Sequence, residues 1–399
     1  MSFVLQIIKI KITTTTTTTI SSFKILVGFG IMSKLVKLRD LTIYLDDRYY
    51  CGPGPSSVQF PDGRIMVAFR RAYNWVPEGV HAHGFPSTEA CLTLSDDNGR
   101  TWGPPRVFNA GNITNQNLVI LPDGSLICLS HRGELVPHTV YDRLKDTRRF
   151  HLDNNFGCVH ASHGIQVMRS QDDGLTWEGP FFVSPVPDTE PILPGWPSPA
   201  GLRASPTNLN DGSVGVAVYG LLGTNRNASN VWFMTSTDRG LTWKPRGCIA
   251  HDPEGLHYYN ETMVYQCEDN KLIAFMRVEQ DMDDRLHTSV SYNDGKTWSA
   301  PRREDIKGHP YQAARVKSGN VLLVYGYRHD PRGVRACLLD PGCDNINKAR
   351  EIVLRDDGGS SDLGYPHVLV LQDGTALVTY YHNIANGVRY ITGTILTEE

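Results

Sequence analysis

One eight-residue phrase occurs four times in this chain, and it constrains the fold more than any other feature. The copies share the form Ser-x-Asp/Asn-x-Gly-x-Thr-Trp and start at Ser95, Ser170, Ser236 and Ser291. Each copy follows a short apolar run, which predicts a strand that enters a tight turn, with the tryptophan packing back beneath it. Recurrence of such a phrase is typical of a repeat architecture, in which one unit cannot bury its hydrophobic face alone.

A second phrase recurs out of phase with the first and sets the number of repeats. It combines a turn with a β-branched, nearly continuous apolar strand, as expected for an inner strand that is covered on both faces. Its six copies start at Pro61, Pro122, Asn210, Glu268, Lys317 and Gln372. Six copies against four tryptophan phrases predict six blades, with the tryptophan phrase reduced in the fifth blade to a remnant at Leu339–Asp344.

The two ends of the repeat region indicate how the ring closes. A propeller closes when its last blade pairs with a strand from the start of the repeat region. The last blade ends in the strand Gly387–Leu396, and Leu35–Leu45 is the apolar segment that we expect beside it. The predicted fold is therefore all-β, a six-bladed β-propeller of four-stranded antiparallel blades that fills residues 32–399 as one domain.

The segment Met1–Ile31 does not follow this pattern. It holds the threonine run Thr13–Thr19 between two apolar pieces, each shorter than the ~18 residues of a membrane span. Lys9 and Lys11 fall after the first apolar piece, which does not fit the basic start of a secretory signal. We expect a low-complexity, disordered extension, or translated sequence upstream of a true start at Met32, and a soluble protein, cytoplasmic rather than secreted.

Charge and cysteine content exclude some classes of function. The net charge is −3 and the sequence pI is near 6.5, so no basic patch points to nucleic acid or to anionic lipid. The eight cysteines show no Cys-x-x-Cys pair and no spacing typical of metal ligands. Cys91, Cys128 and Cys337 lie in strand runs, where a cysteine acts as a small apolar residue.

The tryptophan phrase within a six-bladed pattern resembles the Asp-box (BNR) repeat of the sialidase, or neuraminidase, superfamily. The resemblance covers nearly all of residues 32–399, although this phrase alone occurs in many propellers of other functions and indicates fold more than activity. Asn260–Arg277 is similar to the sialidase segment that opens Asn-Glu and closes Met-Arg. This places Glu261 at the family's catalytic glutamate and Arg277 at one arginine of its carboxylate-binding triad.

A second, independent stretch carries the same resemblance. Sialidases place their nucleophilic tyrosine eight residues before the Asp of the final Asp-Gly, and in Gly364–Gly374 that position is Tyr365. Sialic acids carry a carboxylate on the anomeric carbon, which would repel a carboxylate nucleophile, whereas a neutral phenol avoids this repulsion. The resemblance implies that Glu261 takes the proton of Tyr365 during attack and that configuration is retained. A phenol titrates near pH ~10, so it needs such a base and nearby cations.

Other positions depart from the sialidase pattern. Pro53 stands where the family has the first arginine of its triad, and proline cannot replace a bidentate guanidinium. Counting along the fifth blade places the third arginine at Arg332 or Arg335. Arg70 and Arg71, at the end of the first inner strand, are the residues that we expect to compensate for the missing arginine.

The general acid is open as well. Sialidases use an aspartate in the loop before the first Asp-box strand, and the corresponding stretch Val76–Ser95 has no aspartate. Glu89 is the nearest carboxylate and our predicted acid. Glu78, His81 and His83 are the other proton donors in this stretch, and geometry rather than residue type decides such roles.

Two further classes of function stay open. Histidines concentrate in the loops of the first two blades and in the insertion Gly133–Gly164, namely His81, His83, His131, His138, His151, His160 and His163. This concentration of histidines favours, as one alternative, a propeller lyase that acts on uronate-containing glycans. Some such lyases hold a structural metal.

The other alternative is a catalytically inactive propeller that binds a glycan or a protein. Loss of the first arginine and of the loop aspartate fits it, whereas the joint presence of Glu261, Arg277 and Tyr365 argues against it. We therefore predict a sialidase-like exo-glycosidase for a terminal acidic sugar. Its partner is an acidic glycan, with no cofactor, no metal, no nucleic acid and no membrane span, and the oligomeric state is open.

Overall fold

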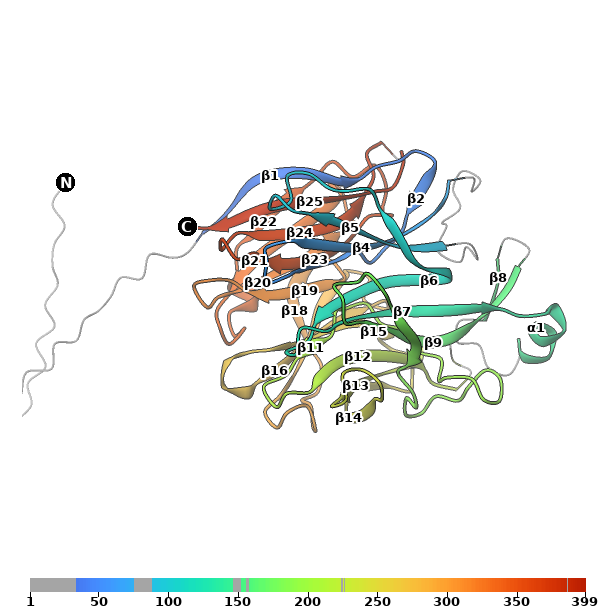
Figure 1. The fold of residues 1–399 in the computed structure, drawn as a ribbon. Coiled ribbons are helices and arrows are strands. Elements are labelled where there is room, and N and C mark those ends of the chain that lie inside the picture. Colours follow the sequence, from blue (N-terminus) through green and yellow to red (C-terminus); the bar gives the residue numbers. More distant parts are fainter. Residues whose placement is uncertain are drawn as a thin grey trace, which may run out of the picture. The chain divides into compact units, whose positions relative to one another are not determined.

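The computed structural model describes residues 34–74, 88–145, 152–155, 158–223, 225, 227–385 and 387–399. In this part of the chain the regular structure is almost entirely β-strand, with one short α-helix, α1 (His138–Leu144), and two single-turn 3₁₀ helices, Glu268–Asn270 and Ile346–Lys348. The strands form four antiparallel sheets of four strands each and one sheet of nine strands (Figure 1). The all-β class and the four-stranded antiparallel sheets that the two recurring phrases predict are therefore confirmed.

Three of the four-stranded sheets are simple meanders, in which each strand pairs with the next along the chain. The first contains β11 (Thr207–Asn208), β12 (Val214–Leu221), β13 (Ser229–Ser236) and β14 (Lys244–Asp252). The second contains β15 (Tyr259–Gln266), β16 (Leu272–Val278), β17 (Arg285–Ser291) and β18 (Arg302–Lys307). The third contains β19 (Tyr311–Arg315), β20 (Val321–Tyr327), β21 (Gly333–Leu339) and β22 (Glu351–Arg355).

The nine-stranded sheet consists of two such meanders that share one long strand, β6 (Arg106–Ile120). The first part of β6 pairs with β5 (Thr88–Ser95) and its second part with β7 (Leu126–Leu135). The first meander also contains β3 (Ser56–Gln59) and β4 (Ile65–Tyr73), and the second also contains β9 (Cys158–Ser170) and β10 (Glu178–Phe182). The short strands β2 (Tyr49–Cys51) and β8 (Leu152–Asn155) extend the sheet. The described residues thus form six four-stranded units.

The last sheet contains a strand from the other end of the described chain. It consists of β23 (Gly364–Val370), β24 (Ala376–His382), β25 (Tyr390–Glu398) and β1 (Leu35–Tyr44). β1 runs antiparallel to β25, with Leu35 opposite Glu398 and Tyr44 opposite Ile391. The predicted pairing of the segment at Leu35 with the C-terminal strand is therefore confirmed.

Hydrophobic clusters join each four-stranded unit to the next and the last unit to the first, so the arrangement is propeller-like. Phe69 of β4 and Tyr381 of β24, for example, lie in one cluster that joins the first unit to the last. The other junctions between consecutive units are filled in the same way by buried aliphatic and aromatic side chains. The first strands of the units also contact each other, because β23 lies against both β19 and β3.

The four tryptophan phrases form turns that are built alike. In the third copy, Ser236 Oγ donates to Asp238 Oδ1 at 2.7 Å and accepts the Gly240 N–H at 2.9 Å, and Asp238 accepts the Thr242 N–H at 2.9 Å. Trp243 is buried and donates its indole N–H to the Gly240 carbonyl at 3.1 Å. Gly240 has φ +83° and approaches the side chains of the preceding sheet. These turns therefore hold neighbouring units together, which is a structural role.

The remnant in the fifth unit is also a tight turn. Asp340 Oδ1 accepts the Asp344 N–H at 2.9 Å, and Cys343 between them has φ +57°. The predicted insertion at Gly133–Gly164 contains the end of β7, the helix α1, the strand β8 and the start of β9, so its described part is largely ordered into regular elements.

Candidate active site

Glu261, Arg277 and Tyr365 meet at one edge of the sheets. Glu261 is the third residue of β15, Arg277 is the last residue but one of β16, and Tyr365 is the second residue of β23. In an antiparallel meander the start of one strand lies beside the end of the next, so Glu261 and Arg277 come from the same edge of one sheet. Tyr365 reaches them from the last sheet of the chain.

Three hydrogen bonds connect these side chains. The Tyr365 hydroxyl donates to Glu261 Oε1 at 2.6 Å. Arg277 Nη1 donates to Glu261 Oε2 at 2.6 Å and to the Tyr365 hydroxyl oxygen at 3.1 Å. The other terminal nitrogen of Arg277 lies 3.1 Å from Glu279 Oε1. A phenol, a carboxylate within proton-transfer distance and a cation that touches both thus share one site.

The ionisation of Glu261 follows from its surroundings. Glu261 keeps only 7% of its surface exposed, and burial by itself raises the pKa of a carboxyl. The Arg277 charge and the hydrogen bond from Tyr365 outweigh burial, and the pKa of Glu261 lies below its ordinary value of 4.5. Near neutral pH this carboxylate is therefore ionised and able to accept a proton.

The phenol of Tyr365 is neutral at the same pH. Burial first, and then the negative charge of Glu261, raise the pKa of Tyr365 to about 12, against the opposing charges of Arg277 and Arg328. Tyr365 can therefore act as a nucleophile only if its proton leaves as it attacks. Glu261 Oε1 already accepts the hydrogen bond that the Tyr365 hydroxyl donates, so it is placed to take this proton.

Arg328 is a functional candidate that sequence reasoning missed. It follows β20 directly, and its guanidinium carbon lies 5.1 Å from the centre of the Tyr365 ring. Its Nη2 donates to the Leu363 carbonyl at 3.3 Å and lies 3.4 Å from the Tyr381 hydroxyl. A signal was present in the sequence, because Arg328 stands near the end of the apolar run of its repeat, as Arg277 does one repeat earlier.

Arg203, just before β11, is a second arginine beside Tyr365 that the sequence did not single out. Its guanidinium carbon lies 4.9 Å from the Tyr365 ring centre, and its Nη2 donates to the Tyr365 carbonyl at 2.5 Å. Arg203 lies outside both recurring phrases, so no spacing indicated it.

Arg332 and Arg335, the arginines predicted by counting, are placed elsewhere. Arg335 is buried in β21, donates to the Pro331 carbonyl at 2.8 Å and to the Arg355 carbonyl, and stacks on Tyr327 at 4.5 Å. Arg332 pairs with the adjacent Asp330 at 3.4 Å. The end of β20 and the start of β21 share one edge of their sheet, with Tyr327 opposite Gly333, but the guanidinium of Arg335 is held by the Pro331 and Arg355 carbonyls. The geometry therefore favours Arg328 over Arg332 and Arg335 as the neighbour of Tyr365.

Arg70 lies against the segment that lacks the predicted first arginine. It is fully buried, and a Cβ at Gly52 would lie 2.1 Å from Arg70 Nη1, so the guanidinium fills the space over Gly52, the residue before Pro53. Burial lowers the pKa of Arg70 to about 10, while the charges of Tyr50 and Asp362 oppose this change. Arg70 therefore stays cationic at neutral pH and approaches the position where the sequence has Pro53.

Arg71 and Glu89 form an ion pair with each other. Arg71 Nε lies 2.7 Å from Glu89 Oε2, Arg71 Nη1 donates to the Tyr44 hydroxyl at 2.8 Å, and its guanidinium stacks on Tyr49 at 4.0 Å. Among the residues that the structure describes, no hydrogen bond or ion pair joins Glu89 to the site at Tyr365. Because its carboxylate is taken up by Arg71, the geometry does not favour Glu89 as the general acid.

The other predicted proton donors, Glu78, His81 and His83, lie outside the described residues, as does His151. Two of the remaining histidines have neighbours typical of packing. His131 Nε2 lies 3.1 Å from Ser162 Oγ, and the His163 ring packs on Trp196 at 4.4 Å. Within the described ranges, no group of three or more His, Cys, Asp or Glu side chains is arranged to hold a metal ion.

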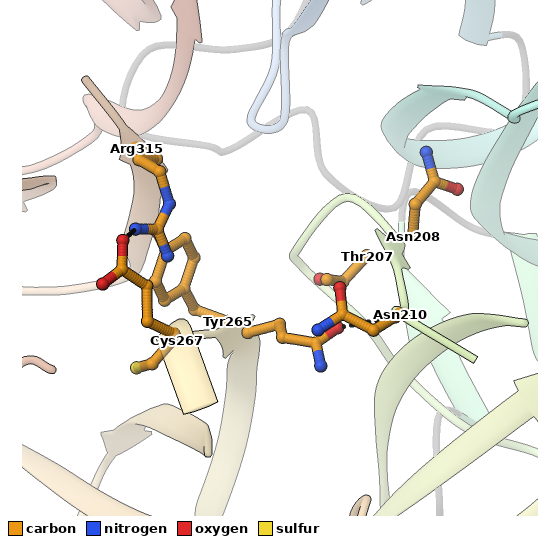
Figure 2. A pocket seen from close by; sticks show the side chains of 8 residues that line it. Thr207, Asn208, Asn210, Tyr265, Cys267 and Arg315 are labelled. Carbon is orange, nitrogen blue, oxygen red and sulfur yellow. Dashed lines mark hydrogen bonds and ion pairs between the residues drawn. The ribbon is translucent and has the colours of Figure 1, made fainter. Parts of the chain in front are cut away.

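The opposite ends of the first strands line a separate polar pocket of about 410 Å³ (Figure 2). Its lining residues are Thr207, Asn208, Asn210, Tyr265, Gln266, Cys267, Glu268 and Arg315. Polar groups of this pocket pair with one another, as in the Arg315–Glu268 ion pair and the hydrogen bond from the Asn210 N–H to Gln266 Oε1 at 2.9 Å. It contains no phenol paired with a carboxylate, so the candidate active site is the Glu261–Tyr365 edge.

These observations define a class: an all-β, propeller-like protein in which one edge of the sheets carries a hydrogen-bonded tyrosine, glutamate and arginine. Residues 136–382 match the model of the BNR repeat-like domain, and the chain belongs to this family. The predicted membership in the Asp-box repeat proteins is thereby confirmed. A comparison with curated proteins gives no match.

Solved structures extend the comparison. A protein of unknown function from Dyadobacter fermentans DSM 18053 is 31% identical, with a TM-score of 0.84 over 92% of this chain and 99% of that chain. The Hadza microbial sialidase Hz136 is 16% identical, with a TM-score of 0.61 over 87% of this chain and 65% of that one. An alpha-L-arabinanase from Penicillium chrysogenum, complexed with arabinobiose, is 15% identical, with a TM-score of 0.57 over 90% and 98%. The last two share the fold with this chain.

One negative finding concerns membranes. In the part of the chain that the structure describes, no helix combines the length and apolar character needed to cross a bilayer.

Proposed function

We propose that this chain is a six-bladed propeller exo-glycosidase that acts on a terminal acidic sugar with retention of configuration. The observation that carries the proposal is the 2.6 Å hydrogen bond from the Tyr365 hydroxyl to Glu261, within a site that also holds Arg277. A buried phenol needs a base at this distance to react near neutral pH, and an ionised carboxylate provides it. The sialidase-like fold supports the same reaction class.

The reaction has two steps. In the first, Tyr365 Oη bonds to the anomeric carbon, its proton passes to Glu261 Oε1, and the glycosidic C–O bond breaks as an acid protonates the leaving oxygen. In the second, water displaces the tyrosine from the anomeric carbon, Glu261 returns the proton to Tyr365 Oη, and the acid's conjugate base takes the proton of the water. We assign the acid to Glu78, His81 or His83.

The substrate class follows from the cations around the site. Arg277 and Arg328 lie beside Tyr365 and are the proposed clamps for a sugar carboxylate, because guanidinium groups pair with carboxylates in a bidentate way. Arg70 supplies a third positive charge over Gly52, beside Pro53. With Pro53 in place of an exposed arginine, the sugar need not be N-acetylneuraminic acid.

A neutral sugar is the second candidate. Pro53 removes one cation of the carboxylate clamp, and the likeness to the alpha-L-arabinanase covers 98% of that protein's chain, against 65% for the sialidase. The loss of that cation favours a neutral sugar such as an L-arabinofuranoside over a sialoside, whereas the arginines beside Tyr365 favour the acidic sugar.

A panel of fluorogenic aryl glycosides tests the proposal and separates the candidates. It contains the glycosides of sialic acid, deaminated sialic acid, glucuronic acid and L-arabinofuranose, each assayed with the unaltered protein and with Tyr365→Phe. We expect release of the aryl group from an acidic sugar, a loss of about 10²-fold or more in Tyr365→Phe, and retained configuration by proton NMR. Unaltered turnover in Tyr365→Phe would refute the mechanism.

The panel, together with polymeric uronates and glycan-binding calorimetry, separates the other classes. Release from L-arabinofuranoside alone selects the neutral-sugar candidate. An unsaturated uronate product from polymeric uronates, detected by its ultraviolet absorbance, selects a lyase. Glycan binding in calorimetry without turnover of any substrate selects an inactive binding propeller.

A further inference from the structure

The backbone at Tyr365 is unusual for a strand. Tyr365 has φ +51° and follows Gly364 at φ +95°, so two consecutive residues adopt the left-handed region that bulky side chains rarely occupy. The pairing between β23 and β24 shifts register between Gly364 and His367, which leaves the intervening carbonyls outside the regular ladder. Such a conformation costs about 1–3 kcal/mol and persists only where the surroundings enforce it.

The group that takes up these carbonyls is the guanidinium of Arg203. Its Nη2 donates to the Tyr365 carbonyl at 2.5 Å and lies 3.3 Å from the Pro366 carbonyl. The same guanidinium lies 4.9 Å from the centre of the Tyr365 ring, so it contacts both the backbone and the ring of one residue. Arg203 is 1% exposed, so this contact lies inside the fold.

Arg203 is itself anchored from a different sheet. Its Nη1 lies 3.4 Å from Asn117 Oδ1 in β6, and Asn117 donates its amide N–H to the Leu129 carbonyl of β7 at 3.2 Å. The contact connects the second unit of the fold, through the segment before β11, to Tyr365 in the last unit. A planar guanidinium with several donors can bridge these groups at once, whereas a lysine ammonium of the same charge cannot.

We infer that Arg203 is a positioning residue for Tyr365, which holds the phenol in its left-handed turn with the hydroxyl against Glu261. This inference rests on the proposed function and goes beyond it, because Arg203 contacts no reacting atom. It follows that Arg203 acts on the chemical step more than on substrate binding. A displacement of about 1 Å at a reacting group can cost about 10²-fold in rate.

The test uses Arg203→Lys in the full-length protein. This substitution keeps the positive charge and removes the planar guanidinium that bridges the carbonyls. Arg335→Lys is the matched control. Arg335 is also buried, donates to backbone carbonyls and stacks on a tyrosine ring, but that ring belongs to Tyr327. We expect kcat to fall about 10-fold or more in Arg203→Lys with KM changed less than about 3-fold. Arg335→Lys leaves both values unchanged.

A second readout does not need turnover. In protein labelled with 3-fluorotyrosine, the fluorine NMR signal of Tyr365 is assigned by its loss in Tyr365→Phe. We expect this signal to move or split in Arg203→Lys and to stay in place in Arg335→Lys. If the unaltered protein turns over no glycoside, the proposed function fails, and the fluorine signal still decides whether Arg203 positions Tyr365.

An unchanged signal together with unchanged kcat in folded Arg203→Lys overturns the inference. If Arg203→Lys does not fold, Arg203→Gln takes its place, since a glutamine amide can still donate one hydrogen bond to the Tyr365 carbonyl. In Arg203→Gln, a lower kcat with a moved fluorine signal supports the inference, and no change in either overturns it.

Discussion

At the scale of single residues, Arg277 decides the charge of the proposed base. Its guanidinium lies 2.6 Å from Glu261 Oε2 and keeps the pKa of a buried carboxyl below the ordinary value of 4.5. Turnover that requires ionised Glu261 is present above this pKa and is lost as the pH falls through it. Without the Arg277 cation, the Tyr365 hydrogen bond and the Arg203 charge still oppose burial, but the largest opposing contribution is gone and the pKa of Glu261 rises.

Arg277→Gln tests this dependence, because glutamine keeps a hydrogen-bond donor and removes the charge. We expect the acid limb of the pH profile of kcat/KM to move to higher pH by about 1–3 units, the usual effect of losing an opposite charge at this distance. The measurement is the initial rate on the best substrate of the glycoside panel between about pH 4 and pH 8. A limb that stays where it is in Arg277→Gln contradicts the assignment of Glu261 as the base.

At the scale of elements, the tryptophan phrase acts through its serine. Ser236 Oγ bonds both Asp238 and the Gly240 N–H and is buried, so Ser236→Ala leaves that N–H without its acceptor. We expect a loss of about 1–3 kcal/mol in the free energy of unfolding, measured in urea. Thr237→Ala, at the exposed neighbouring position, is the control and changes stability by less than about 0.5 kcal/mol. Equal losses in the two variants would mean that the turn does not depend on this hydroxyl.

The sequence predicted these elements well because their signals are local. A turn phrase and an apolar run lie within ten residues, and their recurrence indicates how many strands to expect and in which order. The long strand β6 was not predicted, because no turn phrase separates its two halves. Whether one strand can belong to two neighbouring meanders depends on how both of them pack.

The site was only partly predictable for the same reason. Glu261 and Tyr365 could be named from local patterns, and the structure brings them together from two distant sheets. Arg328 was missed in favour of Arg335 because a count along the chain does not say where a side chain points. The Arg335 guanidinium bonds the Pro331 and Arg355 carbonyls, whereas that of Arg328 lies over the Tyr365 ring. Arg203 was missed because its contact with Tyr365 spans the fold and leaves no periodic trace.

At the scale of the whole molecule, the pairing of β1 with β25 closes the last sheet. Leu35 and Ile43 of β1 are buried, so removal of this strand exposes apolar surface and an unpaired strand edge. We expect a chain that starts at Asp46 to aggregate or to lose its cooperative thermal transition, as measured by size-exclusion chromatography and circular dichroism. A chain that starts at Met32 is the control, and we propose that it matches the full-length protein. A stable monomer in the shorter chain would mean that the other sheets hold the fold without β1.

Several buried histidines make the fold as a whole sensitive to acid. Burial lowers the pKa of His367 to about 3 and those of His309 and His382 to about 4, against an ordinary value of 6.5. Two neighbours keep the His367 imidazole neutral. Its Nδ1 accepts the Ser57 N–H at 3.2 Å, and the positive charge of Arg203 lies nearby. Protonation therefore removes an acceptor and sets two positive charges against each other.

The sign of the pH dependence follows from these shifts. Because each folded-state pKa lies below the unfolded value, the unfolded chain binds protons first as the pH falls below about 6.5. Stability is complete above that pH and falls toward pH 4, by about 1.4 kcal/mol per pH unit for each such histidine. Urea unfolding at several pH values measures this slope, and His367→Gln, which accepts the same N–H without titrating, should reduce it by about one proton. An identical slope in the two proteins would mean that His367 is already protonated in the folded state, which its contact with the Ser57 N–H opposes.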